Sequence, residues 1–339
     1  MKADDLLLHL EAYIALQSTL GFSLRARERL LRNFVAFVQG SGTMGPITAQ
    51  IALDWACLAS DHCGTSGKAA RLSIARRFLF HLSAVVPGTE IPNATLLVRP
   101  RRQMPFLFSA EEISRLLKAA LSLGPQASLR PHTLATLLGL LASSGLRASE
   151  ALNLTVRDVL LDLSPPRLEI RQTKFHKSRL VPIHETVANK LRQYAELRRR
   201  LNYDGLSDFF FVSEQGRHIR YMALYNTFQK LLSSLGIEAR DGSRRPSLHS
   251  LRHGFAVVRL RAWYRQGVDV RAHLPQLSVY LGHLEPAHTY WYLSATPELL
   301  SEAARSFAAY AMTGVSNEHL DCSNPPILFH RTPDLTQAG

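Results

Sequence analysis

Apolar residues recur at helical spacing through the first 85 residues, where no segment shows the alternation of a half-buried strand. The pattern predicts four helices, over residues 4–20, 24–39, 48–59 and 68–85. The second helix has the clearest apolar stripe, which is formed by Leu30, Leu31, Phe34, Phe37 and Val38. We therefore expect residues 1–90 to form an all-helical domain.

Residues that break helices interrupt this pattern before the second half of the chain. They are Pro87, Gly88, Pro92, Pro100 and Pro105. A new helix then begins cleanly, because Ser109 can cap it and Glu112 stands three positions later, as in a capping box. We expect a basic linker over residues 91–107, a second domain over residues 108–315 and a loosely ordered tail over residues 316–339.

The second domain mixes helical and extended patterns. Helices are predicted over residues 133–143, again from residue 184, and over residues 249–266, 274–281 and 297–311. Three short extended runs, over residues 156–162, 167–173 and 179–183, predict a small antiparallel meander. Residues 209–212 fit either a strand or a plug of core side chains. The expected fold is therefore two-domain and mainly α, with an all-helical first domain and an α+β second domain that holds a small antiparallel sheet.

Charge points to an anionic partner, because 40 Lys and Arg residues stand against 27 acids, a formal net charge of +13. Nucleic acid is the first candidate and a membrane surface the second. Basic residues gather on two acid-poor helix faces and in the linker, where they are either phosphate contacts or a solvated surface. These candidates for DNA binding, together with Lys177 of the second domain, are Arg25, Arg29, Arg32, Lys68, Arg71, Arg76, Arg77, Arg101 and Arg102.

The three cysteines, Cys57, Cys63 and Cys322, are too few and too scattered to form a disulfide framework. Cys57 and Cys63 lie near His62, but no second Cys/His pair completes a zinc site, so we expect no metal. The chain starts without a credible signal peptide, and no stretch has the length and apolarity needed to span a bilayer. We expect a cytoplasmic protein, in a bacterium one that works at the nucleoid.

Residues 143–150 read Ser-Ser-Gly-Leu-Arg-Ala-Ser-Glu. Gly145 can end one helix, which places Arg147 in the first turn of the next, with Glu150 one turn later. An anion at that helix start would meet free N–H groups and a guanidinium. The alternative is a surface ion pair between Arg147 and Glu150.

Residues 249–253 read His-Ser-Leu-Arg-His, so His249 and Arg252 share one face of a helix. An imidazole beside a guanidinium suits a phosphate on which charge develops. His249 and His253 also have the spacing of zinc-binding helices, but Ser250 stands where the zinc-protease pattern needs Glu.

The third segment, residues 281–293, contains Leu-Gly-His and, nine residues after His283, Tyr292. Taken together, Gly-Leu-Arg-x-x-Glu, His-x-Leu-Arg-His and Leu-Gly-His followed by Tyr resemble the tyrosine recombinase (phage integrase) family. The stretch from Gln172 to Ile183 resembles the family's lysine-bearing turn between two strands. Its details look closest to the Xer-like recombinases that bacterial transposons and plasmids encode.

The resemblance implies a role for each matching residue in the transfer of DNA strands. Tyr292 would attack the phosphodiester, Arg147 and Arg252 would hold its oxygens, and His283 would position both. His249 would accept a proton or bind the phosphate, and Glu150 would orient Arg147. Lys174, or failing it Lys177, would protonate the leaving 5′ oxygen. Tyr290 is an alternative nucleophile, since it lies two residues before Tyr292.

The resemblance further implies a SAM-like helical core-binding domain at the N-terminus and double-stranded DNA as the substrate. It implies a homo-tetramer on paired sites, with or without partner recombinases, and no metal, cofactor, ATP or membrane. A type IB topoisomerase-like nicking and closing enzyme and a catalytically dead DNA-binding relative are the alternatives. An RNA-binding module is disfavoured, because no aromatic-rich strand motif for stacking bases is present.

Overall fold

The computed structural model describes most of the chain up to residue 295. The described residues are 3–21, 25–42, 45–58, 64–97, 103–125, 127–171, 178–240, 242–283, 285 and 287–295. The predicted helix over 297–311, the predicted tail and the lysine-bearing turn lie outside them.

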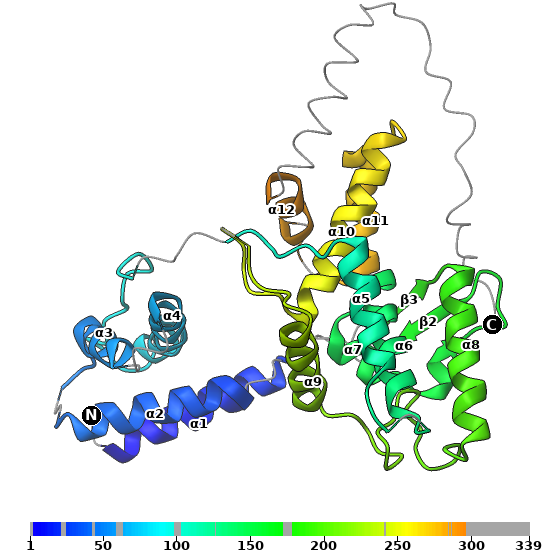
Figure 1. Cartoon of the computed structure of the whole chain (residues 1–339). Coiled ribbons are helices and arrows are strands. Elements are labelled where there is room, and N and C mark those ends of the chain that lie inside the picture. Colours follow the sequence, from blue (N-terminus) through cyan, green and yellow to red (C-terminus); the bar gives the residue numbers. More distant parts are fainter. Residues whose placement is uncertain are drawn as a thin grey trace, which may run out of the picture.

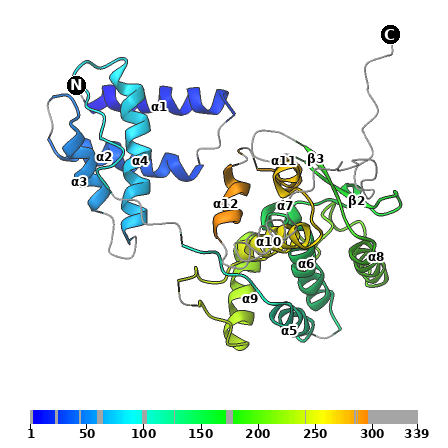
Figure 2. The same cartoon turned by 90° about the horizontal axis from the view of Figure 1, so that it is seen from above.

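The N-terminal part consists of the four helices that the apolar pattern predicts. They are α1 (Ala3–Thr19), α2 (Arg25–Gly40), α3 (Ala49–Cys57) and α4 (Gly64–Ser83). Leu10, Phe34, Ile47 and Phe78 are fully buried in one cluster that residues of these helices share, and Trp55 packs edge-on against Phe34. Both views draw α1–α4 as a group of their own (Figures 1 and 2). The domain limits themselves stay predictions.

The remaining helices build the C-terminal part around a small sheet (Figure 1). The helices are α5 (Ala110–Leu121), α6 (Arg130–Ser144), α7 (Ala148–Leu152), α8 (Glu185–Arg200), α9 (Tyr221–Ser234), α10 (Leu248–Arg265), α11 (Val270–Leu281) and α12 (Ala287–Ala295). The strands are β1 (Val159–Leu160), β2 (Arg167–Ile170) and β3 (Arg179–Pro182). Strand order is β1-β2-β3 and both pairings are antiparallel, as in the expected meander. The predicted mainly α fold with a small antiparallel sheet is confirmed.

The first strand is shorter than predicted, because residues Val156–Asp158 form a 3-10 turn instead. The carboxylate of Asp158 accepts hydrogen bonds from the backbone N–H and the hydroxyl of Thr155, which closes the turn before pairing with β2 can begin. Residues 209–212 form only isolated bridges, and Phe210, Phe211 and Val212 are buried. Of the two structures predicted for this segment, the core plug is the one observed.

The predicted linker is only partly irregular. Phe106 is 1% exposed, and the guanidinium of Arg240 lies 4.5 Å from the centroid of its ring. Arg240 also donates to the backbone oxygen of Leu107 and to Glu112. Arg244 N–H donates to Met104 O. The end of the segment predicted as linker therefore packs against the C-terminal part, because its aromatic residue Phe106 is covered there.

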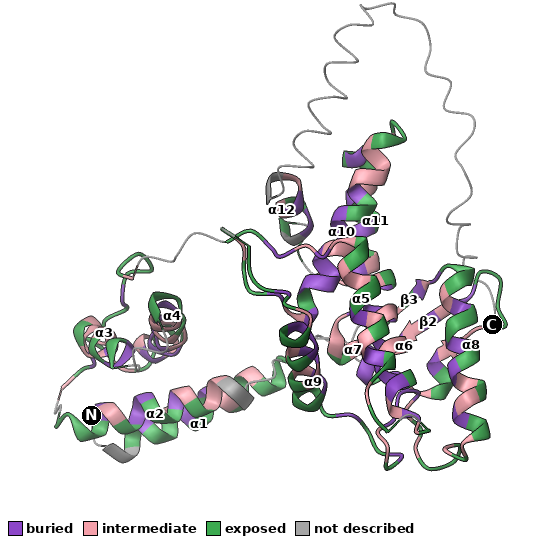
Figure 3. Cartoon of the chain, viewed as in Figure 1, coloured by how far each residue is buried: buried purple, intermediate pink, exposed green. Residues whose placement is uncertain are grey.

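Two helices of the C-terminal part were not predicted individually. One is α9, and the other is α12, which carries Tyr292. A second cluster of buried residues lies between α10, α11 and α12 and includes Leu260, Leu277 and Tyr292. Figure 3 shows α8 with exposed and buried residues in alternation along its length, whereas the lower part of α10 is buried. The helices that carry the second and third sequence motifs, α10 and α12, thus contribute side chains to the buried core of the C-terminal part.

Candidate active site

Three arginines converge on the C-terminus of α11, where each donates to a different backbone oxygen. The pairs are Arg179 Nε to Tyr280 O (2.9 Å), Arg252 Nη2 to Leu281 O (2.6 Å) and Arg147 Nη2 to Gly282 O (2.8 Å). The last carbonyls of a helix lack partners within it and form the negative end of its dipole, so cations are stabilised there. Gly282 makes the turn possible, because its φ of +67° is left-handed.

Arg147 lies where two helices meet. Gly145 ends α6 in the left-handed region, and a Cβ at this position would come within 2.5 Å of the Phe255 ring. Arg147 has extended backbone angles and is the N-cap of α7, so the prediction that it lies in the first helical turn is wrong by one position. Its side chain is 36% exposed, which leaves a positively charged group accessible from solvent.

Glu150 is buried between two arginines and is not part of a surface pair. Its side chain is 8% exposed. Oε1 accepts from Arg147 Nη1 (2.7 Å) and Arg179 Nη1 (3.0 Å), and Oε2 accepts from Arg147 N–H (3.0 Å) and Arg179 Nη2 (2.8 Å). Burial raises the pKa of Glu150, but the hydrogen bonds and charges of Arg179 and Arg147 outweigh it and lower the pKa to about 2. Glu150 is therefore ionised at neutral pH.

Arg252 is 1% exposed and holds the loop after α6 to the end of α11. Its Nη1 donates to Gly145 O at 2.8 Å, while Nη2 reaches Leu281 O. Burial, and secondly the charge of Arg147, lowers the pKa of Arg252 to about 10, so it keeps its charge at neutral pH. Among the described residues, its buried Nε has no hydrogen-bond partner. Three guanidinium groups and one carboxylate thus leave two net positive charges in this cluster.

Tyr292 is buried at 2% exposure, and its hydroxyl lies 2.7 Å from Nδ1 of His253 (hydrogen bond). The ring of His253 stands edge-on to that of His249, with the centroids 4.4 Å apart. Tyr290, by contrast, is 45% exposed. Only the second tyrosine therefore packs against the histidine pair of α10, which favours Tyr292 over Tyr290 as the reacting group.

His283 follows the left-handed Gly282 and connects α11 with α12. A hydrogen bond of 2.7 Å joins its Nδ1 to the hydroxyl of Thr289, which is completely buried. This hydrogen bond connects α12, the helix that carries Tyr292, to His283, the histidine of the same motif.

Arg179 and His253 were missed as site residues by sequence reasoning. Arg179 shares a face of β3 with the buried Val181, since residues two apart on a strand point to the same side. That alternation was the available signal for Arg179. His253 was considered only as a metal ligand, and no group of three metal-ligating side chains exists among the described residues.

Some of the predicted lysine and DNA-binding residues lie outside the described residues, and others contact neighbouring protein groups. Lys174, Lys177, Arg101 and Arg102 and the side chain of Arg25 lie outside the described residues. Arg32 pairs with Glu11 and Glu28, and Arg76 donates to Pro92 O. Arg71 lies over the Trp55 ring at 4.1 Å and donates to Trp55 O. Lys68 is half-buried, and Arg29 and Arg77 are exposed. Contact of these residues with DNA stays a prediction.

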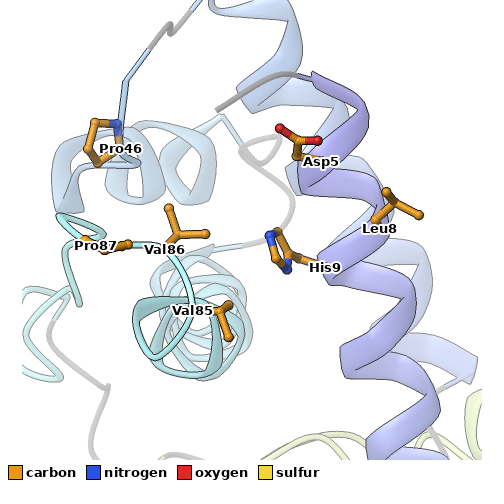
Figure 4. Close-up of a pocket in the computed structure, with 7 residues that line it drawn as sticks. All are labelled: Asp5, Leu8, His9, Pro46, Val85, Val86 and Pro87. Atoms are coloured by element: carbon orange, nitrogen blue, oxygen red, sulfur yellow. The ribbon is translucent and has the colours of Figure 1, made fainter.

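A hollow of about 490 Å³ lies in the N-terminal part, away from the motif residues. Figure 4 shows it between α1 and the turn after α4. Its lining consists of Asp5, Leu8, His9, Pro46, Val85, Val86 and Pro87. This composition offers no cluster of positive charge for a phosphate. Cys57, the cysteine that the structure describes, is exposed rather than buried, and no described helix is long and apolar enough to cross a membrane.

The family model of the phage integrase family matches residues 107–298, which include all the motif residues described above. The chain belongs to this family. A recombinase of the family from Sinorhizobium fredii, the integrase/recombinase y4rB, is 41% identical over 300 residues, which cover 87% of this chain and 94% of that protein. The tyrosine recombinase XerA of Thermococcus kodakarensis is 32% identical over 205 residues, 60% of this chain and 62% of that protein.

Solved structures of other recombinases share the fold. The site-specific recombinase XerH bound to difH DNA after cleavage has a TM-score of 0.63 at 17% identity, covering 84% of this chain and 80% of that one. The integrase of the transposon Tn1549 in complex with transposon right end DNA also has a TM-score of 0.63, at 15% identity, covering 89% and 99%.

Proposed function

We propose that this integrase-family protein is a site-specific DNA recombinase that cuts and rejoins strands through a 3′-phosphotyrosine intermediate on Tyr292. The observation that carries the proposal is the Tyr292 hydroxyl, which is held at 2.7 Å by a buried imidazole on the same helix as Arg252. A tyrosine hydroxyl has a reference pKa near ~10, so it needs a proton acceptor and nearby positive charge to attack at neutral pH.

The reaction balances without an external energy source. Tyr292 Oη forms a bond to phosphorus, the bond between phosphorus and the 5′ oxygen breaks, and the proton of Tyr292 passes to a histidine of α10. Arg147 and Arg252 stabilise the charge on the non-bridging oxygens. Lys174 donates the proton that the 5′ oxygen takes up. The phosphotyrosine bond conserves the energy for rejoining, and we propose that neither ATP nor a metal ion takes part.

The relatives support the proposed substrate class. XerH is bound to a recombination site and the Tn1549 integrase to transposon end DNA, while λ integrase has been solved as a dimer on a core site and as a tetramer on a Holliday junction. We propose that the present chain acts on paired double-stranded sites as a tetramer, moving or resolving a mobile element.

Trapping on a nicked substrate tests the chemistry. A duplex nicked just beyond the scissile phosphate loses its short leaving strand, so the covalent protein–DNA complex accumulates and migrates slowly on a denaturing gel. We expect this complex with the wild type and with Tyr290→Phe, also in EDTA, and none with Tyr292→Phe. Trapping by Tyr292→Phe, or a strict need for Mg²⁺, would contradict the proposal.

Two further measurements separate the alternatives. Lys174→Ala should slow cleavage, and a 5′-thio leaving group should restore it, because a thiolate leaves without protonation. Rescue of Lys177→Ala instead would assign the proton donor to Lys177. Two labelled linear duplexes with sites should yield exchanged products, whereas an enzyme that only nicks and closes would return the parental strands.

A further inference from the structure

Arg179 makes all its described side-chain contacts with groups that hold the site together. It has two hydrogen bonds to Glu150 and one to the oxygen of Tyr280, and it is 10% exposed. Each oxygen of Glu150 receives one hydrogen bond from Arg179 and one from Arg147. The carboxylate is thus shared between an inner arginine and the arginine that faces solvent.

This sharing decides how much charge Arg147 can offer. A carboxylate paired with Arg147 alone would neutralise it, whereas with Arg179 present the trio of two guanidinium groups and one carboxylate keeps one net positive charge. A buried carboxylate also needs compensation, because an ion left without its partner in the interior is strongly unfavourable. Arg179 supplies this compensating positive charge from the inner side of Glu150. The solvent-facing side of Arg147 therefore stays open to an anion.

Arg179 also fixes the end of α11. Its guanidinium lies directly over Gly282, where a Cβ would come within 2.6 Å of Nη1. The next residue is His283, and Gly282 O accepts the hydrogen bond of Arg147. A shift of this turn would therefore move His283 and a contact of Arg147 together.

We propose that Arg179 is a positioning residue of the recombination site, which aims Arg147 through Glu150 and fixes the turn that presents His283. It touches no reacting atom. This inference rests on the proposed function, since the phosphate that Arg147 meets is that of the DNA strand being cut. Arg179 lies in the stretch that resembles the family's lysine-bearing turn, but the sequence assigned it no role. Its role follows from the shared carboxylate and the α11 contact.

The test compares Arg179→Gln with a matched control, Arg198→Gln. Arg198 is also a buried arginine, at 5% exposure, but it pairs with Asp204 and donates to Ser207 O, both of which follow the C-terminal end of α8. Both variants should lower the melting temperature. We expect only Arg179→Gln to slow formation of the covalent complex on the nicked duplex, by about tenfold or more, with DNA affinity within about threefold of the wild type.

Dependence on pH and on Glu150 distinguishes positioning from a general loss of stability. The charged groups facing Glu150 are Arg147 on the N-cap of α7, Arg179 on β3 and Arg252 on α10. Without Arg179 the pKa of Glu150 rises, so cleavage by Arg179→Gln should fall more steeply than that of the wild type between pH 7.5 and 5.5. The wild-type curve is the reference, because the two proteins differ only at residue 179. Glu150→Gln combined with Arg179→Gln should be no slower than the slower single variant.

The outcomes separate the two proposals. A wild type that forms no covalent complex overturns the proposed function. A wild type that forms it, with Arg179→Gln as fast at every pH, overturns the role of Arg179 and leaves the function standing. If Arg179→Gln does not fold, Arg179→Lys replaces it in the test. Lysine keeps the positive charge but cannot make the bidentate hydrogen bond to Glu150. Equal cleavage by Arg179→Lys and the wild type would then contradict positioning by geometry.

Discussion

The hydroxyl of Tyr292 and Nδ1 of His253 lie 2.7 Å apart, although 39 positions separate the two residues in the chain. Tyr292 donates in this hydrogen bond whenever Nδ1 carries no proton. His253 is therefore placed to accept the proton of Tyr292, the proposed nucleophile. It lies one residue after Arg252, so one helix bears both a proposed phosphate ligand and the hydrogen-bond partner of Tyr292.

Replacement of His253 tests this relationship. His253→Phe should slow covalent complex formation about a hundredfold, because both the hydrogen bond and the base are lost. His253→Asn keeps a group that can hydrogen-bond near Nδ1 but no base, so it should recover only part of the rate. His273→Asn, which changes a half-buried histidine of α11 whose ring lies beside Trp263, is the control. If His253→Phe cleaves DNA as fast as the wild type, the contact between His253 and Tyr292 has no role in cleavage and belongs only to the DNA-free protein.

The motif residues were predictable because their order along the chain is itself the signal. Their hydrogen-bond partners Arg179 and His253 were not predictable, because the packing of distant segments decides which residues lie together. The segment of α12 has aromatic residues at three consecutive positions, 290–292, so its sequence does not show which of them faces α10. The acid-free face of α4 likewise predicts phosphate contacts, but it cannot reveal that Arg71 lies over Trp55.

Gly282 offers a test of the turn at the end of α11. Gly282→Ala should lower stability by about 1–2 kcal/mol, because its left-handed backbone disfavours a side chain. It should also reduce cleavage about tenfold, since the new Cβ displaces Arg179. The control is Gly267→Ala, where φ is +68° and nothing lies within 4 Å of the added Cβ. Melting curves and trapping assays on both variants separate strain from displacement, and equal cleavage by the two would argue against the displacement.

Glu150 should make the folded protein sensitive to acid. Its pKa is about 2 in the folded state against 4.5 for the free group, so its ionised form stabilises the fold above pH 4.5. That contribution, about 3 kcal/mol from the size of the shift, is lost as the pH falls from 4.5 towards 2. Urea unfolding at pH 7, 5 and 3 measures it. Glu150→Gln should be less stable at pH 7 and should lose less stability on acidification.

Glu196→Gln provides the control for this measurement. Glu196 also pairs with arginine, but it lies on the surface of α8, where water screens the pair. Its replacement should leave the pH dependence of unfolding close to that of the wild type. A Glu150→Gln variant that behaved in the same way would mean that the buried carboxylate adds nothing to folding.

The arrangement of the two parts of the chain leads to the last prediction. We expect residues 1–90 and the C-terminal part to be separate domains that bind opposite faces of one duplex. Since Phe106 is packed against the C-terminal part, the fragment for this test should begin at Gln103 rather than at Phe108. Each fragment alone should bind DNA weakly, and the whole chain far more tightly, because tethering raises the effective concentration of the second domain.

Protease and salt complete the test of this arrangement. Limited proteolysis should cut between residues 88 and 102, before the packed Met104 and Phe106, and DNA should slow that cut. Binding should weaken steeply with salt, as many phosphates are neutralised at once, and Arg77→Gln, which removes an exposed charge of α4, should flatten the dependence by about one unit of slope. Replacing Arg76, which already donates to Pro92 O, should change the slope less. An N-terminal fragment without DNA affinity would contradict the proposed role of α1–α4 in holding DNA.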